Sequence, residues 1–185
     1  MIKTLNFLAL TLLLISCNYN LINKWENYDE IEEIKTNAKS ENKRLQFKRI
    51  QSISNDKNQL INGFEREIFN FLENEYDLTK ELVHEKSIPE IQQSVIDGKL
   101  TYYKLSLFYL TRIYLIEFDK ESYLNSIISI NKNILREAKS KDKIKNTNIY
   151  SLHGIPILLK DNIGFKGLPT TAGAHSLKNN FTDDA

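Results

Sequence analysis

The sequence predicts an α/β chain in which helices come first and the first strands of a mixed sheet follow. Three observations support this prediction. Apolar residues recur at three- or four-residue steps over most of residues 18–118, which is the helical period. Two short apolar runs, 124–130 and 155–159, have the length and composition of strands. Four of the six glycines and two of the three prolines lie between Gly154 and Gly173, where backbone shape must be tightly specified.

Composition excludes several classes of function. Hydrophobic residues make up 41% of the 185 residues and charged residues 26%, which is typical of a globular chain. The formal net charge is +1, so the chain has no broad positive field for nucleic acid, and no nucleic-acid partner is expected. A single Cys cannot form an intramolecular disulfide or a Cys-rich zinc site. No metal-ligand spacing and no phosphate-binding loop is present, so we expect neither metal nor cofactor.

The start of the chain has the features of an export signal. One Lys precedes the apolar run 5–15, which ends in Ser16-Cys17. The run is shorter than the 20 or so residues that a membrane-spanning helix needs. Residues 14–17 (LISC) resemble the lipobox of bacterial lipoproteins, in which the Cys is acylated after cleavage. The resemblance implies a signal peptide at 1–16 and an exported protein anchored through Cys17, on the periplasmic or outer-membrane side. The alternative is an incidental Cys behind an uncleaved anchor.

Residues 17–78 are predicted to form a polar helical extension that also serves as a tether. The stretch 18–77 contains no Pro and one Gly, and Asn, Lys and Glu are frequent in it. Its clearest helical piece is 65–72 (EREIFNFL), whereas the polar residues 52–62 favour a loop between two helices.

The chain from residue 79 onward has clearer boundaries. Ser87-Ile88-Pro89-Glu90 has the form of a capping box, and Gly98 is a natural end for the helix that follows. Thr101 is expected to cap a second helix that runs to about residue 118. A strand is predicted over 124–130, a helix over 132–141 and a polar loop over 143–150.

The chemistry is expected in residues 152–173. The run 155–159 (IPILL) predicts a strand buried on both faces, as in a parallel sheet. Lys160 at its end would therefore lie in a low dielectric, where its pKa falls and a neutral amine can accept a proton. The alternative is a surface Lys whose ammonium reaches into solvent beside Asp161.

Residues 153–163 (HGIPILLKDNI) and 168–173 (LPTTAG) resemble the amidase signature family near its first catalytic residue. Residues 87–92, 98–101 and 124–131 are similar to the family's opening helices and the strand after them. The resemblance covers about 79–185, which would be the N-terminal portion of an amidase domain. It implies the first strands of the amidase-signature mixed sheet, incomplete in this chain.

The family hydrolyses carbon–nitrogen amide bonds of small-molecule substrates with a Ser–cis-Ser–Lys triad and no cofactor. Lys160 matches the triad Lys, which draws a proton through the bridging Ser from the nucleophilic Ser. Thr170, Thr171, Ala172 and Gly173 match a loop near the catalytic centre, and the resemblance gives them no chemical role. The Gly/Ser-rich segment that bears both serines in the family is not found in this sequence.

Three interpretations follow from these observations. In the first, the chain is the N-terminal fragment of a lipid-anchored amidase and is inactive alone. In the second, it is a non-catalytic lipoprotein, either a small interaction module or a pseudogene remnant. In the third, it completes a separately encoded C-terminal half that carries the serines. The family's tRNA-dependent amidotransferase subunits are a further alternative, against which the export signal argues because charged tRNA is cytosolic.

Overall fold

The computed structural model describes residues 24–26, 31–46 and 56–183, and within these ranges the regular secondary structure is helical, joined by loops and turns. The predicted signal peptide at 1–16 and the lipidation residue Cys17 lie outside the described residues. In the described part of the chain, no helix combines the length and the apolar character needed to cross a bilayer. The helices are α1 (Ile31–Ala38), α2 (Lys43–Gln46), α3 (Asn58–Ile61), α4 (Glu65–Asn74), α5 (Tyr76–Val83), α6 (Ile88–Ile96), α7 (Tyr102–Glu117) and α8 (Ile134–Asp142), with a 3₁₀ turn at His175–Leu177.

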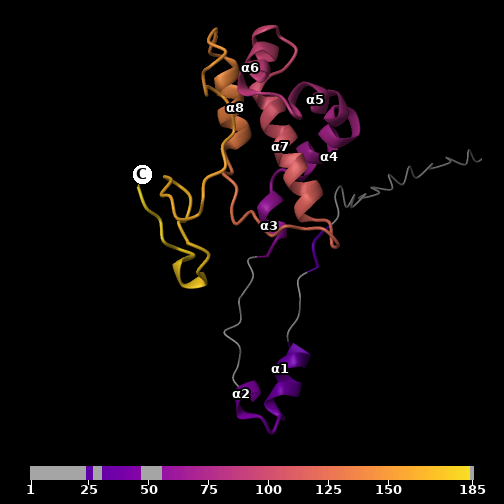
Figure 1. Ribbon diagram of the computed structural model, residues 1–185, viewed down its shortest axis with the longest axis vertical. Coiled ribbons are helices and arrows are strands. Elements are labelled where there is room, and N and C mark those ends of the chain that lie inside the picture. The colour runs from indigo at the N-terminus through magenta and orange to yellow at the C-terminus, as the bar shows by residue number, and fades with distance from the viewer. Residues whose placement is uncertain (1–23, 27–30, 47–55, 184–185) are drawn as a thin grey trace, which may run out of the picture.

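The longest helix, α7, lies at the centre of the core (Figure 1). It packs against α4, α5 and α8, and α5 in turn contacts α4 and α6. Leu105 is fully buried and Phe108 is 1% exposed, and residues on other sides of the helix, such as Leu110 and Tyr114, are buried as well. The prediction of a helix from Thr101 to about residue 118 is confirmed, but α7 is buried on more than one face because neighbours cover it from several directions.

The boundaries of α6 follow the predicted capping signals. Ser87 and Glu90 form the capping box: the Ser87 amide and hydroxyl donate to the Glu90 carboxylate at 2.8 and 2.6 Å. These hydrogen bonds hold the pKa of Glu90 below its usual value. Gly98 has a φ of +74°, the left-handed conformation that favours glycine after a helix end. Both predicted ends of this helix are therefore confirmed.

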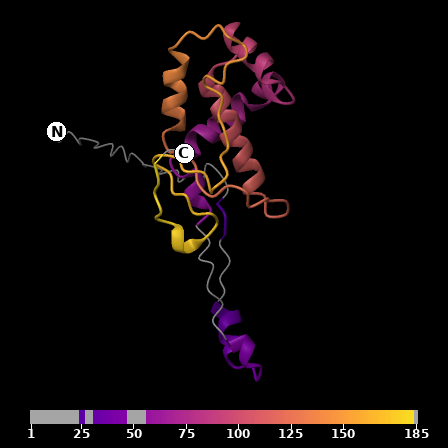
Figure 2. The ribbon, with the colours of Figure 1, turned by 60° about the vertical axis from the view of Figure 1, so that its left-hand side comes forward.

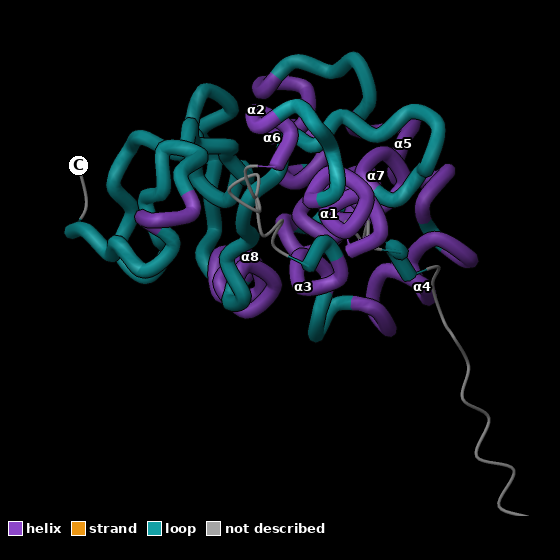
Figure 3. Tube along the Cα trace, turned by 90° about the horizontal axis from the view of Figure 1, so that it is seen from below, coloured by secondary structure: helices purple, strands orange, loops and turns teal. Residues whose placement is uncertain are grey.

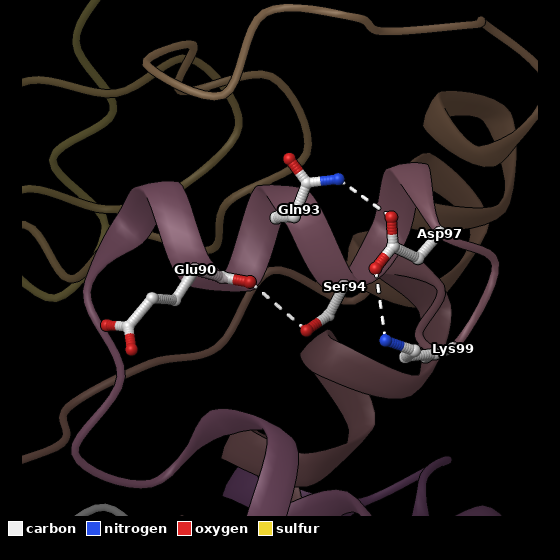
Figure 4. Close-up of polar contacts among 5 residues, drawn as sticks. All are labelled: Glu90, Gln93, Ser94, Asp97 and Lys99. Carbon is white, nitrogen blue, oxygen red and sulfur yellow. Dashed lines mark hydrogen bonds and ion pairs between the residues drawn. The ribbon is translucent and has the colours of Figure 1, made fainter.

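Polar side chains fix the exposed face and the last turn of α6 (Figure 4). Ser94 Oγ donates to the Glu90 carbonyl at 3.1 Å. The Asp97 carboxylate accepts hydrogen bonds from Gln93 Nε2 at 2.7 Å and from Lys99 Nζ at 3.1 Å. Those two donors lower the pKa of Asp97. The side chain of Asp97 thus ties the helix end to the turn that leads into α7.

The predicted mixed sheet is wrong for the described residues, in which no strand is formed (Figure 3). Residues 124–130 have no regular secondary structure. Asn125 has a φ of +50°, which breaks a regular strand, and Ile127 and Ile130 pack on the helical core. β-Branched residues favour a strand only when a neighbouring strand takes up the backbone hydrogen bonds. Within the described residues, the only β-bridge joins Pro169 and Phe181.

Part of the predicted polar extension belongs to the core. Leu60, Ile61 and Ile68 are buried together with α7 residues, whereas neither α1 nor α2 contains a buried residue. The predicted helix over 65–72 is confirmed as part of α4. The predicted loop over 52–62 is wrong at 58–61, where α3 forms because burial of two apolar side chains outweighs the polar composition. The proposed domain boundary between 78 and 79 stays a prediction.

Lys57 is buried at the end of α7, in a cage formed by Trp25, Glu117 and Tyr123. Its Nζ lies 3.2 Å from Glu117 Oε2 and 4.2 Å from the centroids of both aromatic rings. Lys57 is 8% exposed and Glu117 is 1% exposed. Burial alone would raise the pKa of Glu117, but the hydrogen bonds from Ser126 and the Lys57 ammonium outweigh it and lower the pKa. The cage therefore holds an ion pair that attaches the segment around Trp25 to the helical core.

The cage predicts a large cost for removing its only carboxylate. Glu117→Gln keeps the side-chain shape but leaves the Lys57 ammonium buried without a counter-charge, so we expect the free energy of unfolding to fall by about 3–5 kcal/mol. Trp25 is the only Trp in the chain, so its fluorescence in a urea titration reports the cage directly. Circular dichroism in the same titration follows the helices.

The matched control is Glu26→Gln, which breaks the ion pair between Glu26 and Lys120 at 3.1 Å. Both of its side chains are exposed, at 82% and 66%. Solvent screens such a pair, so the expected loss is below about 1 kcal/mol. Equal losses in the two variants would show that burial of the Lys57 pair does not contribute to stability.

Candidate functional site

Gln92 joins α6 to the segment that leads into the predicted site. This fully buried residue donates from Nε2 to the carbonyls of Ser151 and His153 at 2.7 and 2.9 Å. Its Oε1 accepts hydrogen bonds from the Tyr102 hydroxyl at 2.7 Å and from Asn146 Nδ2 at 3.1 Å. Every polar atom of the Gln92 side chain is thus used to hold residues 146–153 against the helices.

Two side chains hold the first turn of α7, one at the end of α8 and one at the residue before α7. The Asp142 carboxylate, at the end of α8, accepts the backbone amides of Tyr102 at 2.7 Å and Tyr103 at 3.1 Å. Thr101 Oγ1 accepts the amide of Lys104 at 3.1 Å, which confirms the predicted cap. A carboxylate at this end also suits the positive end of the helix dipole. The backbone of Tyr102 is consequently held in place, and its ring offers a fixed surface for packing.

His153 and Gly154 pack on that surface. The imidazole of His153 meets the Tyr102 ring edge-on, with 5.4 Å between ring centroids. Gly154 has a φ of +72°, and a Cβ there would lie 2.3 Å from Cγ of Tyr102. Only glycine combines this backbone conformation with so close an approach. His153 and Gly154 therefore fix where the chain between α8 and Lys160 passes over α7.

The predicted strand 155–159 has no regular secondary structure and is not buried on both faces. Ile155 contacts the core, whereas Ile157, Leu158 and Leu159 are 63%, 75% and 49% exposed. Figure 2 shows the chain from α8 onward running beside the helices without a paired strand. Ile157 and Leu158 are thus largely open to solvent and Leu159 is half-buried, so the run has the apolar composition of a buried strand without the burial.

Lys160 is exposed in the structure. The expected low dielectric around its amine is therefore wrong for the described residues, because the apolar strand that was to surround it is itself exposed. The Lys160 carbonyl accepts the amide of Ile163 at 2.9 Å, which closes a turn directly after the run 155–159. The structure thus places Lys160 on a defined turn with its side chain open to solvent.

Asp161, the next residue, holds the loop with the Thr-Thr-Ala-Gly motif. Its carboxylate accepts the amides of Thr171 and Gly173, both at 3.1 Å, and the hydroxyl of Thr171, while its carbonyl accepts the amide of Ala172 at 3.0 Å. Partial burial would raise the pKa of Asp161, but the Thr171 hydroxyl and the two amides lower it overall. The structure thereby brings Lys160 and three of the four predicted loop residues to one place.

The fourth predicted loop residue, Thr170, belongs to a second contact. Its amide donates to the Asn180 carbonyl at 2.8 Å, Asn180 Nδ2 donates to the Thr170 carbonyl at 2.9 Å, and its hydroxyl lies 3.0 Å from that of Thr182. These bonds and the bridge between Pro169 and Phe181 close residues 169–182 into a compact loop.

An open groove of about 520 Å³ lies between the start of α8 and residues 159–168. Its polar side includes Asn131, Asn133 and Glu137, and its apolar side includes Leu159 and Phe165. Among the described residues, no group of three or more His, Cys, Asp or Glu side chains is placed to hold a metal ion. The groove lies beside the Lys160 turn, and both polar and apolar side chains line it.

Comparison with known proteins relates this part of the chain to one family. Residues 109–185 match the family model described as Amidase. The chain is 31% identical over 94 residues to a glutamyl-tRNA(Gln) amidotransferase protein of Microcystis aeruginosa, and 35% identical over 98 residues to its counterpart in Acinetobacter baumannii. The crystal structure of an amidase family protein from Bacillus anthracis str. Ames has a TM-score of 0.58 and 30% sequence identity.

The chain spans a small part of these proteins. The two amidotransferase proteins are matched over 19% of their length, with 50% and 52% of this chain aligned. The B. anthracis structure is matched over 27% of its chain and 72% of this one. The resemblance predicted from residues 153–173 is therefore supported in its family, and the sheet that it implied is not formed by the described residues.

Two functionally placed residues are not evident from the sequence alone. Asp161 reads in the sequence as a charged neighbour of Lys160, although Asp followed ten residues later by Thr-Ala-Gly is compatible with a side chain that caps a loop. Gln92 carries no local signal, because its partners at Ser151 and His153 lie about sixty residues away in the sequence.

The packing of Gly154 on Tyr102 predicts that Gly154→Ala destabilises the chain strongly. The added methyl group meets a ring that is 1% exposed and fixed by Gln92, so the ring has no space into which it can move. We expect a loss of about 1–3 kcal/mol beyond the backbone cost of a left-handed Ala, measured as the shift of the urea midpoint.

Gly167→Ala isolates the backbone cost. Gly167 has a φ of +89°, and a Cβ there would meet no atom within 4 Å. The variant should lose only about 1–2 kcal/mol. A Gly154→Ala variant no less stable than Gly167→Ala would argue against close packing on Tyr102.

Proposed function

We propose that this chain supplies the lysine-bearing part of a lipid-anchored amidase that hydrolyses carbon–nitrogen amide bonds by a Ser–cis-Ser–Lys mechanism. Its substrates are small amides, and it uses no cofactor. The observation that carries the proposal is the Amidase match over 109–185, within which Lys160 ends the segment HGIPILLK. The serines are expected on the part of the amidase domain that the relatives have beyond the matched fifth of their length.

The exposed apolar side chains support an association with the rest of such a domain. Burying an Ile or Leu side chain contributes about 1.5–3 kcal/mol, and Ile157, Leu158 and Leu159 are all largely exposed. A covering strand would satisfy the backbone of 155–159 and remove water from around Lys160 in the same step. Desolvation would then lower the pKa of the Lys160 amine, which the proposed mechanism requires.

In the proposed reaction, neutral Lys160 accepts a proton through the bridging serine from the nucleophilic serine. The serine oxygen attacks the amide carbonyl, and the tetrahedral intermediate collapses as the carbon–nitrogen bond breaks. The proton held by Lys160 returns to the leaving nitrogen. Water then hydrolyses the acyl-enzyme with Lys160 again as base. The chain alone, with exposed Lys160, is proposed to be inactive.

A second candidate function follows from the activity of two of the relatives. The two quoted above belong to glutamyl-tRNA(Gln) amidotransferase. A chain with that role would release ammonia from an amide donor for transfer to glutamyl-tRNA(Gln). The proposed export signal argues against it, because the tRNA substrate is cytosolic. A non-catalytic lipoprotein is the remaining alternative.

The catalytic proposal is tested by combining the chain with a segment that carries the serines of the proposed triad. The full chain is co-expressed with the segment of the B. anthracis amidase family protein that lies beyond the matched part, and ammonia release from small amides is measured. We expect hydrolysis from the pair and from neither part alone. Lys160→Ala should reduce kcat by at least about a thousandfold, because the serine then lacks its base.

Lys178→Ala is the matched control, since Lys178 is an exposed Lys in the same C-terminal region and lies outside the Lys160 turn. It should retain the activity of the parent pair. Equal activity in the parent and in Lys160→Ala would exclude the lysine mechanism. Ammonia release that rises on addition of glutamyl-tRNA(Gln) would favour the amidotransferase candidate.

Anchoring through Cys17 is tested separately by growing expressing bacteria with a clickable palmitate analogue. Cys17 is the only Cys in the chain, so thiol acylation has one place to occur. We expect labelling and membrane sedimentation of the parent and of Ser16→Ala, and loss of both in Cys17→Ser. Labelling that persists in Cys17→Ser would contradict the anchor.

A further inference from the structure

The turn at Lys160 and the loop at 171–173 are joined by a single residue. Four hydrogen bonds from Thr171, Ala172 and Gly173 end on Asp161: two amides and a hydroxyl on the carboxylate, and one amide on the carbonyl. Thr171 is itself only 6% exposed, so water does not readily replace these partners.

The loop needs such a partner because its backbone is unfavourable alone. Ala172 and Gly173 both have positive φ, at +48° and +74°. For Ala172 this conformation is sterically disfavoured. The amides of Thr171 and Gly173, on either side of Ala172, both donate to the Asp161 carboxylate, and the Ala172 amide donates to the Asp161 carbonyl. These bonds to Asp161 hold the loop in this shape.

Lys160 is the residue directly before Asp161 in the chain. The peptide bond fixes Asp161 to Lys160, and the turn from Lys160 to Ile163 is closed by its own hydrogen bond at 2.9 Å. Any movement of the 171–173 loop must therefore be transmitted to the backbone of Lys160 or break the bonds to Asp161.

We propose that Asp161 is a positioning residue that locks the Lys160 turn to the 171–173 loop, so that the two present one rigid surface to the substrate. The inference rests on the proposed function for the role of Lys160. It goes beyond that function in assigning to Asp161, and not to the loop threonines, the task of fixing the lysine.

The first test measures amide hydrogen exchange by NMR in the full chain and in Asp161→Ala. The amides of Thr171 and Gly173 should exchange at least about tenfold faster in the variant, because they lose their acceptor. Asp119→Asn is the matched control: Asp119 holds a turn in the same way, through the amide of Glu121 at 3.1 Å and the hydroxyl of Ser122, but far from Lys160 in the sequence. Its loop amides at 171–173 should exchange as in the parent.

The second test asks whether the loop is coupled to the lysine. Thr171→Val removes one bond to Asp161 from ten residues away and keeps the side-chain shape. It should shift the backbone amide signal of Lys160. Thr170→Val, whose hydroxyl bonds to Thr182 instead, should leave that signal in place. Thr171→Val thus tests the inference even where Asp161→Ala fails to fold.

Activity separates the inference from the proposed function. In the reconstituted pair, Asp161→Ala should lower kcat at least about tenfold with little change in KM, while Asp119→Asn retains both. Unchanged exchange in Asp161→Ala, or a Lys160 signal that Thr171→Val does not move, overturns the positioning role. Failure of the parent pair to hydrolyse any amide counts against the proposed function alone, because exchange and the Lys160 signal still decide the role of Asp161.

Discussion

The burial of α7 on several sides is the constraint on which the packing of the helical core depends. Its side chains form the surface against which α4, α5 and α8 pack, and its first turn carries Tyr102. Tyr102 in turn determines how closely the chain passes at Gly154. Gln92 holds the Tyr102 ring, and Asp142 holds the Tyr102 backbone. The helical core alone therefore fixes the course of the chain at Gly154, six residues before Lys160.

Local signals predicted the helices well, because their causes are local. The capping box at Ser87–Glu90, the left-handed Gly98 and the Thr101 cap each depend on residues within four positions of one another. The strands could not be predicted in the same way. A strand in a sheet requires hydrogen bonds to another segment, which can be distant in the sequence. The apolar composition of 155–159 favours burial, but the described residues leave most of this run exposed.

The candidate site depends on a distant contact as well. The family resemblance pointed to Lys160 and the Thr-Thr-Ala-Gly loop, and in the structure Asp161, the residue after Lys160, contacts three of the four loop residues. It did not indicate which residue joins them, because a carboxylate beside a lysine in a sequence suggests an ion pair. The structure instead directs Asp161 toward backbone amides. Its partners are neutral groups that no motif of charged residues would reveal.

The backbone and the side chain of Lys160 lie in different environments. The turn that carries Lys160 is ordered by contacts within the chain, because Asp161 accepts hydrogen bonds from residues 171–173, whereas the Lys160 side chain is exposed. Ile157 and Leu158, just before it, are largely exposed as well. Under the proposed function, a covering segment would bury these apolar side chains and exclude water from around the Lys160 amine in the same step. The proposed mechanism requires this loss of water, which favours the neutral amine, because a charged ammonium cannot accept a proton.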